Sequence, residues 1–479
     1  MFVNRTWELD ELETRWEGGQ YQMALLWGRR RVGKTRLLDE FARNKPTIVY
    51  QADEGTPTEQ LARLTDRIVA YSDDAALRAQ PLTNWDAAIA TMLRLTREAK
   101  RDGRQLLVIF DEFPRLVMAT PRLPSMLQDA IEDVRREGLP LFLVLAGSQI
   151  SLYEEHVLHG PLYGRRTWGE QLTPLSYRDA GKFFPTWSPA DRLRAWAVLG
   201  GIPYYLEQFD SARSLHWNIV RRLLAKGVVL YDEAELMIKE ELGQDAATYL
   251  SIIAAVAGGR TKMAEIATIA GVENISSYLG RLERLHMVER MQPAGASLSS
   301  RRGLWQLCDN YLRAWFEFVR ANRTDLEARR GQAVFDSRIR PGFDQFVSRP
   351  AFEVAVRAHA RSCIGIDPTF PARAEISAWW GPIPDQSAPA GSKRTREGEV
   401  ELVGYDGKHL VLAGESKWSD GLEDGGGLSQ LKRTVVHVPG YDPDATKLAI
   451  YTRAGFTDEF RAKAEREGVI LRTVEDMYA

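Results

Sequence analysis

Residues 28–35 read Gly-Arg-Arg-Arg-Val-Gly-Lys-Thr, which has the residue types and the spacing of a phosphate-binding loop. Glycines let backbone N–H groups curve around phosphates, Lys34 can reach the β- and γ-phosphates, and the Thr35 hydroxyl can bind Mg²⁺. An apolar run precedes the loop and a helical pattern follows it, which a chance Gly-Lys-Thr turn would lack. We therefore expect ATP and Mg²⁺ to be bound by Gly28, Arg29, Arg30, Arg31, Val32, Gly33, Lys34, Thr35 and Arg36.

A second apolar run, residues 106–110, ends in the adjacent carboxylates Asp111 and Glu112. Asp111 is predicted to hold Mg²⁺, and Glu112 to orient and deprotonate the attacking water. A solvated acidic turn is the alternative reading of such a strand end taken alone. The upstream phosphate-binding loop favours the catalytic interpretation, and a glutamate after the metal-holding aspartate favours hydrolysis over passive binding.

A third apolar run, residues 139–146, is followed by Gly147-Ser148-Gln149. A polar side chain at this strand tip could sense the γ-phosphate, and Ser148 is the first candidate, with Gln149 the second. An ordinary helix cap is the equally weighted alternative.

Composition bounds the class of protein. The 479 residues suggest about three domains, and a net charge of −2 argues against a uniformly basic protein that coats DNA. Two widely spaced cysteines, Cys308 and Cys363, exclude a disulfide scaffold and predict a reducing, cytoplasmic location. The N-terminus is charged and has no apolar core typical of a signal peptide, and the longest apolar stretches are too short to span a membrane.

The order of patterns along the chain predicts four parts. Alternating apolar runs and helical patterns over residues 1–175 indicate an α/β fold, a doubly wound parallel sheet. Residues 176–244 show only helical periodicity, as in a helical lid, and residues 245–308 suggest a winged helix-turn-helix. Residues 309–479 begin helical and then show strands, with a loop expected over residues 381–396. Strands are expected at residues 22–27, 47–50, 105–110, 139–146, 167–172, 288–292, 304–307, 400–405, 409–413 and 446–451.

The segments NRTWELDEL, GRRRVGKTRLLDEF, LLVIFDEF, LVLAGSQ, GPLYGRRT and GGIPYYL together resemble the archaeal-type ATPase family, a branch of the AAA+/STAND NTPases. The resemblance covers roughly residues 1–240 and implies a doubly wound sheet with a helical lid. It implies that Arg165 or Arg166 stabilises γ-phosphate charge, within one chain or from a neighbouring subunit. It also implies that Pro203 lies near the adenine, with Arg5 close to the base. Without the resemblance, the two arginines would be plain surface charges.

If the third helix of the winged element enters a major groove, its N-terminal side chains and the wing would contact DNA. A winged helix that only couples the ATPase to the tail is an equally weighted alternative, because little positive charge is available. The expected base readers are Asn274, Ser276, Ser277 and Arg281, and the expected phosphate contacts are Arg301 and Arg302.

The tail contains DNYLRAWFEFV, AFE, AWWG, REGEVELV and LVLAGESKW. It resembles the uncharacterised domain that commonly follows this ATPase type, which is similar to PD-(D/E)XK nucleases. The resemblance implies that Glu401 and Glu415 hold Mg²⁺ or Mn²⁺ with support from Glu353, and that Lys417 helps activate water. Glu401 stands where the family usually has aspartate, and Glu399 could substitute for it.

Strand geometry adds a condition. Side chains alternate along strands, so a two-residue turn at Asp406-Gly407 would turn Glu401 away from Glu415 and Lys417. A three-residue loop with Gly407 left-handed restores a common face, and we expect that loop. A salt-bridged strand end is the alternative interpretation of the Glu-Ser-Lys tripeptide.

These patterns together predict an ATP-hydrolysing protein that repositions a winged helix and a nuclease-like, Mg²⁺- or Mn²⁺-dependent tail on DNA. The alternative is a non-cleaving, nucleotide-dependent regulator that binds DNA or protein, and a third class is a chaperone-like ATPase. ATP and DNA are the expected partners, together with further copies of the chain or another protein, and no membrane.

Overall fold

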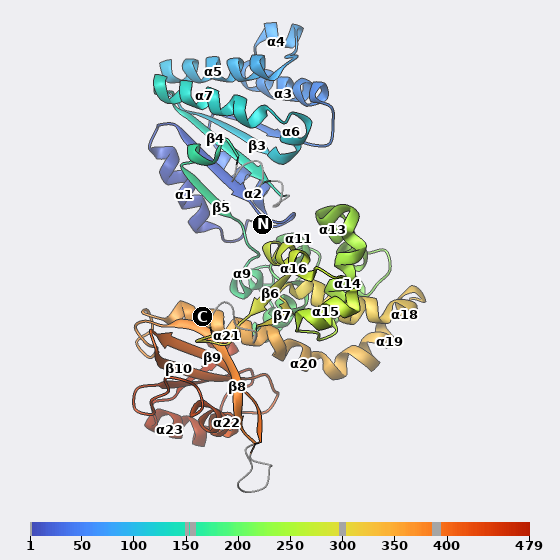
Figure 1. Ribbon diagram of the computed structural model, residues 1–479, viewed down its shortest axis with the longest axis vertical. Helices are drawn as coiled ribbons and strands as arrows, with labels where there is room; N and C mark the ends of the chain where they lie inside the picture. Colours follow the sequence, from blue (N-terminus) through green and yellow to red (C-terminus); the bar gives the residue numbers. More distant parts are fainter. Residues whose placement is uncertain (1, 149–152, 154–159, 297–302, 386–393) are drawn as a thin grey trace. The chain divides into compact units, whose positions relative to one another are not determined.

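The computed structural model describes residues 2–148, 153, 160–296, 303–385 and 394–479 (Figure 1). The chain divides into two compact units. The N-terminal unit comprises Met1–Pro174 with Ile202–Tyr204, and the C-terminal unit comprises Leu175–Gly201 with Tyr205–Ala479. The predicted lid, winged helix and tail therefore belong to one compact unit, and the finer division into four parts stays a prediction.

The N-terminal unit is built on a five-stranded sheet in the order β2-β3-β4-β1-β5. Every neighbouring pair is parallel, so the carboxyl ends of all five strands meet at one edge of the sheet. This confirms the predicted doubly wound α/β class. The strands are β1 (Gln22–Trp27), β2 (Thr47–Gln51), β3 (Leu106–Asp111), β4 (Leu141–Gly147) and β5 (Trp168–Gln171).

Helices cover both faces of this sheet, because the buried strands present apolar side chains to both sides. On one face, residues such as Leu25 and Phe110 pack in a single core with the helices that follow β2 and the helices that follow β3 (Figure 1). On the other face, Trp16 and Phe41 contact Phe142 of β4. The helices are α1 (Thr6–Glu17), α2 (Lys34–Ala42), α3 (Pro57–Ser72), α4 (Ala75–Ala79), α5 (Trp85–Arg101), α6 (Phe113–Ala119) and α7 (Leu123–Glu137).

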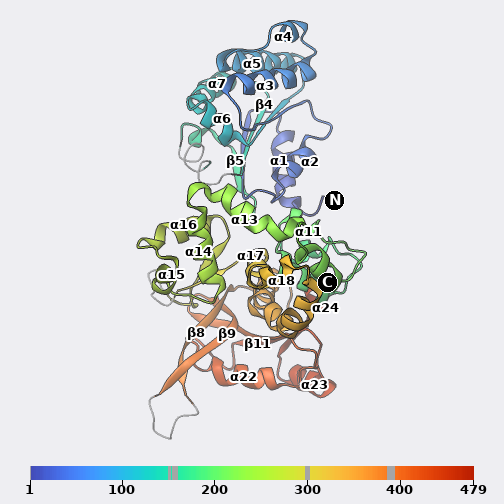
Figure 2. The same cartoon turned by 90° about the vertical axis from the view of Figure 1, so that its right-hand side faces the viewer.

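The C-terminal unit begins with helices and continues into three helices followed by a two-stranded antiparallel sheet, as the winged pattern predicts. Figure 2 shows the three helices of this element grouped together. The first helices are α9 (Tyr177–Gly181), α10 (Pro189–Leu199), α11 (Pro203–Leu206, which begins in the N-terminal unit), α12 (Leu215–Asn218) and α13 (Val229–Leu242). The winged element comprises α14 (Ala246–Ala257), α15 (Met263–Ala270), α16 (Ile275–Arg284), β6 (Val288–Met291) and β7 (Leu304–Leu307).

A helical segment rich in buried aromatic side chains leads from the winged element to the last sheet. It comprises α17 (Asn310–Ala314), α18 (Arg323–Glu327), α19 (Gly331–Val334), α20 (Phe343–Phe346) and α21 (Glu353–Cys363). Trp315 anchors it, since the buried indole donates to the carbonyl of Tyr231 at 2.7 Å.

The last sheet has the order β12-β11-β10-β9-β8. β8, β9 and β10 are antiparallel neighbours, whereas β10, β11 and β12 run parallel. One face packs against α22 (Gly426–Val435) and α23 (Asp458–Arg466), which Figure 2 shows along the sheet. The strands are β8 (Glu375–Pro384), β9 (Thr395–Asp406), β10 (His409–Lys417), β11 (Lys447–Thr452) and β12 (Ile470–Thr473), and the chain ends in α24 (Val474–Tyr478).

Sequence reasoning missed β8 and β12, and it extended one loop too far. The loop expected over residues 381–396 is strand at both ends, because Gly381–Pro384 pairs with Thr395–Gly398. Residues 386–393 of that loop lie outside the described residues. Gly381, Pro382 and Pro384 at the end of β8 obscured a strand that pairs with β9 over most of its length.

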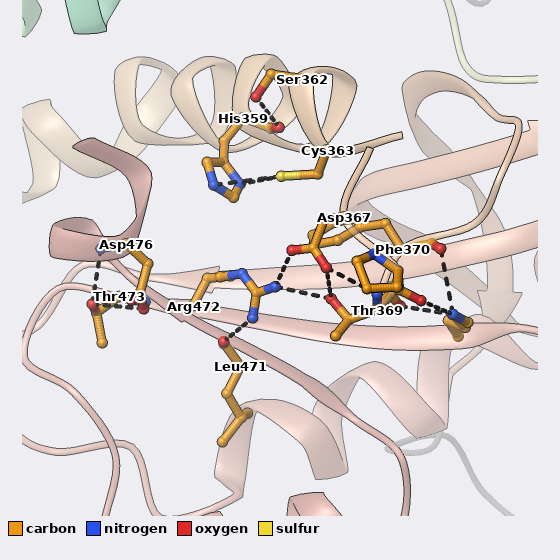
Figure 3. Close-up of polar contacts among 12 residues, drawn as sticks. His359, Ser362, Cys363, Asp367, Thr369, Phe370, Leu471, Arg472, Thr473 and Asp476 are labelled. Atoms are coloured by element: carbon orange, nitrogen blue, oxygen red, sulfur yellow. Dashed lines mark hydrogen bonds and ion pairs between the residues drawn. The ribbon is translucent and has the colours of Figure 1, made fainter. Parts of the chain in front are cut away.

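Polar contacts fasten the end of the chain to the loop after α21 (Figure 3). Arg472 of β12 pairs with Asp367 at 2.5 Å and donates to the Thr369 hydroxyl at 2.9 Å. Nearby, His359 of α21 contacts the Tyr451 hydroxyl at 2.9 Å, and the Cys363 sulfur lies beside the imidazole. These contacts place a buried histidine inside the C-terminal unit.

Candidate functional sites

The phosphate-binding loop connects β1 to α2 and depends on its two glycines. Gly28 has φ +149°, and a Cβ at this position would lie 2.4 Å from the Leu172 carbonyl oxygen. Gly33 has φ +102° and caps the N-terminus of α2. Both conformations are strained for any residue with a side chain, so the two glycines set the path of the loop. The N-terminus of α2 then faces the space that the loop encloses, which favours an anion there.

Lys34 lies across this loop. It is 5% exposed, and its ammonium donates to the carbonyl oxygens of Gly28 at 2.8 Å and Arg29 at 3.1 Å. These contacts hold the charged group within the loop, where the phosphates of a nucleotide are expected. Of the other predicted loop residues, Arg29 and Val32 are buried, Arg30 is half-buried, and Arg31 and Arg36 are exposed.

Thr35 and Asp111 are brought together, as the metal prediction requires. The Thr35 hydroxyl donates to Asp111 Oδ2 at 2.6 Å. Asp111 is 2% exposed, and burial raises its pKa, with the Thr35 hydrogen bond acting in the opposite direction. A hydroxyl and a buried carboxylate are ligands that Mg²⁺ accepts, and Mg²⁺ commonly takes few protein ligands and completes its shell with phosphate and water. The two residues therefore fit a Mg²⁺ ion bound together with a nucleotide.

Glu112 and Ser148 meet because β4 lies between β1 and β3 in the sheet. The Ser148 hydroxyl donates to Glu112 Oε2 at 2.8 Å, and the Ser148 backbone N–H donates to the same oxygen at 3.2 Å. Glu112 itself has φ +54°, a left-handed conformation for a residue that caps α6. Ser148 thus contacts the expected base, and its role as a phosphate sensor stays a prediction. Gln149 lies outside the described residues.

Arg5 and Pro203 both lie against the phosphate-binding loop. Arg5 is buried and donates to the carbonyl oxygens of Val32 at 3.2 Å and Thr173 at 2.6 Å. The Pro203 ring lies 3.8 Å from the position that a Cβ on Gly33 would occupy. Both residues therefore contact the loop from segments distant in sequence, and their contact with the base of a nucleotide stays a prediction.

Arg165 and Arg166 lie near the amino ends of the parallel strands, whereas the phosphate-binding loop lies at their carboxyl ends. They precede β5, which runs parallel to β1 with Ala24 opposite Trp168 and Trp27 opposite Gln171. Arg165 pairs with Glu132 at 2.7 Å, and Arg166 lies over the Tyr163 ring. The loop therefore lies about 16 Å away, the length of five strand residues, which exceeds the reach of an arginine side chain. The intra-chain alternative is wrong for this arrangement, and action across an interface stays a prediction.

A second candidate site lies in the last sheet. Glu401 of β9 and Glu415 of β10 are both buried and line a pocket of about 450 Å³. The predicted three-residue loop is wrong, because His409 pairs with Asp406 across a two-residue turn. Instead, a bulge at Val411 shifts the register by one residue, so that Leu412 pairs with Gly404. This shift gives Glu401 and Glu415 the common face that the loop was expected to provide, and Gly407 is left-handed as expected.

Arg349 bridges the carboxylates of this pocket, and no sequence motif pointed to it. Its guanidinium pairs with Glu353 at 3.2 Å, Glu399 at 3.3 Å and Glu401 at 3.3 Å. Glu401 is also held by the Ser416 backbone N–H at 2.8 Å and by the Ser416 hydroxyl. We call Arg349, Glu353, Glu399, Glu401 and Glu415 the carboxylate cluster.

Lys417 contacts the same cluster from the end of β10. Its ammonium donates to Glu415 Oε1 at 2.8 Å, and Gln430 of α22 donates to the same oxygen at 3.2 Å. The pair resembles the salt-bridged strand end that the sequence left open, and it also places Lys417 beside the expected metal ligands. Gln430 was missed, since a glutamine on an amphipathic helix carries no signal in one sequence.

The residues of this cluster do not, as arranged, fit a bound divalent ion. Within the described residues, no group of three or more His, Cys, Asp or Glu side chains is placed to hold one. Arg349 occupies the region between Glu353 and Glu401, and oxygens of Glu401 and Glu415 are already paired. The expected metal role of Glu353, Glu401 and Glu415 therefore finds no support in this arrangement.

Of the residues of the winged element that were expected to contact DNA bases, three are exposed and one turns inward. Asn274, Ser276 and Ser277 are exposed at the start of α16. Arg281 instead turns inward, because it donates to the Glu241 carbonyl at 3.2 Å and lies over the Tyr249 ring. Its predicted role as a base reader is therefore wrong for this arrangement. Arg301 and Arg302 lie outside the described residues.

The parallel sheet and the Lys34–Thr35–Asp111–Glu112 arrangement define a P-loop ATPase domain. Residues 2–209 match a family model described as an ATPase domain predominantly from Archaea, and residues 315–432 match one described as archaeal and bacterial proteins of unknown function. The N-terminal part of the chain thus matches this archaeal ATPase model, and the second matching region follows it in the same chain.

Two proteins of Methanocaldococcus jannaschii are similar to this chain. One, described as uncharacterized, is 25% identical over 430 residues, which is 88% of each chain. The other, described as an uncharacterized ATP-binding protein, is 51% identical over 45 residues, 9% of this chain and 76% of that protein.

Among solved structures, the Walker-type ATPase of Pyrococcus abyssi is 19% identical, with a TM-score of 0.49 over 66% of this chain and 96% of that one. The ORC2 protein of Aeropyrum pernix is 16% identical, with a TM-score of 0.41 over 68% and 95%. The fold assignment rests on the strand order and the loop geometry described above. No helix in the described parts of the chain has the length and apolar character needed to cross a bilayer.

Proposed function

We propose that the chain is an ATP-hydrolysing switch whose nucleotide state repositions the C-terminal unit on DNA. The observation that carries the proposal is the contact of Thr35 with Asp111 beside a glutamate, Glu112, that two Ser148 donors hold in place. Asp111 and Thr35 would hold Mg²⁺, which neutralises charge on the transferred phosphate, and Lys34 would bind the β- and γ-phosphates. Glu112 would accept a proton from the attacking water.

Chain connectivity supports a switch. The chain crosses between the two units after Pro174, after Gly201 and after Tyr204. Between the last two crossings lie Pro203, beside Gly33, and Tyr204, whose ring lies 4.4 Å from the Arg31 guanidinium. A change in the loop on nucleotide binding would therefore act on a short segment that leads directly into the C-terminal unit.

The test is Glu112→Gln. Removing the base should lower ATP turnover by about 100-fold or more and leave ATP binding intact, because the amide keeps the size of the side chain. Turnover would be followed by phosphate release, and binding by equilibrium titration with a fluorescent ATP analogue. The matched control Glu98→Gln removes a carboxylate from the surface of α5. Undiminished turnover in Glu112→Gln would remove this residue from the mechanism.

DNA is the proposed partner because α16 presents Asn274, Ser276 and Ser277 at its exposed N-terminal end. Substituting both serines by glutamate should weaken binding of duplex DNA, which fluorescence anisotropy would measure at two salt concentrations. ATP turnover that responds to unfolded polypeptide and not to DNA would favour the chaperone-like class instead.

A second candidate function is phosphodiester cleavage by the C-terminal pocket. The Val411 bulge favours it, since the bulge sets Glu401, Glu415 and Lys417 on one face of the sheet. DNA cleavage would be measured with ATP and Mg²⁺ or Mn²⁺, with Lys417→Ala and Lys34→Ala alongside. Cleavage lost in Lys417→Ala supports an ATP-regulated nuclease, and intact ATP hydrolysis without cleavage of any DNA form supports a tail that only binds.

A further inference from the structure

Arg349 uses each of its three guanidinium nitrogens on a different carboxylate. Nε pairs with Glu353 Oε1, Nη1 with Glu399 Oε2 and Nη2 with Glu401 Oε1, all at 3.2–3.3 Å. These carboxylates come from α21 and β9, so the guanidinium joins two elements at one point. A planar cation shared by three acids occupies the kind of position that a multivalent cation takes among carboxylates.

Basic side chains surround the four carboxylates of the cluster. Arg349 and Lys417 pair with them directly, and Arg357, Arg396 and Arg433 add positive charge nearby. Burial, followed by the charges of Glu401 and Glu399, raises the pKa of Glu353 to about 8. Burial, followed by Glu401, raises the pKa of Glu415 to about 7.

Glu353 has one buried oxygen whose partner is the Arg349 guanidinium. Its Oε1 is buried and makes no hydrogen bond in the described part of the chain, since the contact with Arg349 Nε is an ion pair without hydrogen-bond geometry. The residue itself is 7% exposed. The Arg349 guanidinium is thus the cation that offsets the burial of this oxygen, and its removal would leave Glu353 in need of another cation or of water.

The acids and the arginine differ in access to solvent. The side chains of Glu353 and Glu401 are almost fully buried, at 9% and 7% exposure, whereas the Arg349 side chain is 55% exposed. The guanidinium can therefore leave toward solvent while the carboxylates stay. Arg396, Arg433 and His437 line the same pocket, so an anion that enters it meets other basic groups as well.

We propose that Arg349 is a removable counter-ion that excludes divalent metal from the carboxylate cluster until a nucleic-acid phosphodiester draws the guanidinium away. A phosphate pairs with guanidinium in the same bidentate way as a carboxylate, so the two compete for Arg349. Once Arg349 leaves, Glu353, Glu401 and Glu415 can approach one ion. Linkage then requires that DNA raises metal affinity and that metal raises DNA affinity by the same factor. The inference rests on the proposed cleavage role only for its choice of anion.

The test measures Mn²⁺ binding to the full, nucleotide-free chain from the electron paramagnetic resonance signal of free Mn²⁺. Arg349→Ala should bind one Mn²⁺ at least tenfold more tightly than the wild type, and the double variant Arg349→Ala/Glu401→Gln should lose that gain. The matched control Arg396→Ala removes a positive charge from the pocket wall, keeps the three Arg349 pairs and should behave as the wild type.

DNA supplies the second arm of this test. A duplex should tighten Mn²⁺ binding to the wild type toward the value of Arg349→Ala and should leave Arg349→Ala unchanged, with Mn²⁺ held by the duplex itself subtracted using Glu401→Gln. Glycerol 2-phosphate in place of the duplex identifies the source of the phosphate. A change in the Mn²⁺ affinity of the wild type with this monoester, and none with DNA, would overturn the assignment to nucleic acid.

Folding is monitored in parallel, because Arg349→Ala removes a cation from a buried acidic cluster. Mn²⁺ should raise the Tm of Arg349→Ala by several degrees and that of the wild type much less, and Arg349→Lys should lie between them. Equal Mn²⁺ responses in wild type and Arg349→Ala, by either readout, would overturn the proposal. Tighter Mn²⁺ binding by Arg349→Ala without DNA cleavage would leave this inference standing and would count against the nuclease function alone.

Discussion

The nucleotide site and the carboxylate cluster hold buried negative charge in opposite ways. At the nucleotide site, Asp111 is the buried carboxylate, it accepts from the Thr35 hydroxyl, and Lys34 lies on the loop nearby. In the cluster, several carboxylates share the guanidinium of Arg349. The first site is arranged to receive a nucleotide with its metal, whereas the second is closed by a cation of its own chain.

The two sites also differ in what fixes their geometry. The phosphate-binding loop is one contiguous segment whose path follows from Gly28 and Gly33. The carboxylate cluster needs the correct register between β9 and β10 and the packing of α21 against the sheet. A local change should therefore disturb the second site more easily than the first.

Deleting Val411 would test this difference most strongly. Without the bulge, Glu415 faces away from Glu401, and buried acids would lose their partners or the strands would slip. We expect the free energy of unfolding of the C-terminal unit to fall by about 3–5 kcal/mol, with ATP binding by the N-terminal unit retained. Urea unfolding followed by tryptophan fluorescence and nucleotide titration would measure the two effects.

The control for this deletion is Val411→Ala, which keeps the bulge and should cost only about 1 kcal/mol. A deletion variant as stable as Val411→Ala, with the Mn²⁺ gain of Arg349→Ala still present, would show that the strands re-form the same register by another route.

The same contrast explains what the sequence could predict. The ATPase core, its parallel sheet and the approach of Thr35 to Asp111 follow from contiguous motifs and from the fold that such motifs accompany. The approach of Glu401 to Glu415 was expected, but for a different reason. A three-residue loop and a two-residue turn followed by a bulge place the same side chains on one face of the sheet. A bulge at Val411 leaves no signature in residue type.

Long-range pairing was the part that sequence reasoning could not reach. Arg349 contacts three acids that are up to 52 residues away along the chain, and nothing near it in sequence distinguishes it from other arginines. Arg281 has the spacing of a base reader but turns inward to Glu241. Arg165 and Arg166 matched a family motif, and only the register of β5 against β1 showed which edge of the sheet they occupy.

A pH titration would sharpen the comparison, because the C-terminal unit buries a histidine as well as acids. Burial, followed by the charges of Arg178 and Arg472, lowers the pKa of His359 to about 4 (Figure 3). The unfolded chain takes up this proton near pH 6.5, whereas the folded chain resists it, so stability is lost as the pH falls from 6.5 to 4. The loss should reach about 3 kcal/mol for this group.

His359→Gln should remove that loss, and urea unfolding at pH 7.5 and 5 would measure it. Glu353 and Glu415 act with the opposite sign, because their raised pKa values make the folded state bind protons more tightly, so their contribution is lost as the pH rises through 7 to 8. The difference between His359→Gln and wild type isolates the histidine, and the exposed His409→Gln serves as the control. If the free energy of unfolding of His359→Gln falls between pH 7.5 and pH 5 as much as that of the wild type, groups other than His359 cause the loss.

The smallest effect is expected from Ser148→Ala at the nucleotide site. The variant removes the hydroxyl that donates to Glu112 Oε2 at 2.8 Å but keeps the backbone N–H at 3.2 Å. One lost donor of two should lower ATP turnover by about fivefold, equivalent to about 1 kcal/mol. If Ser148 acts through Glu112, the double variant Ser148→Ala/Glu112→Gln should be no slower than Glu112→Gln alone. An additive loss in the double variant would instead indicate direct contact of Ser148 with the γ-phosphate, the role that the sequence first suggested.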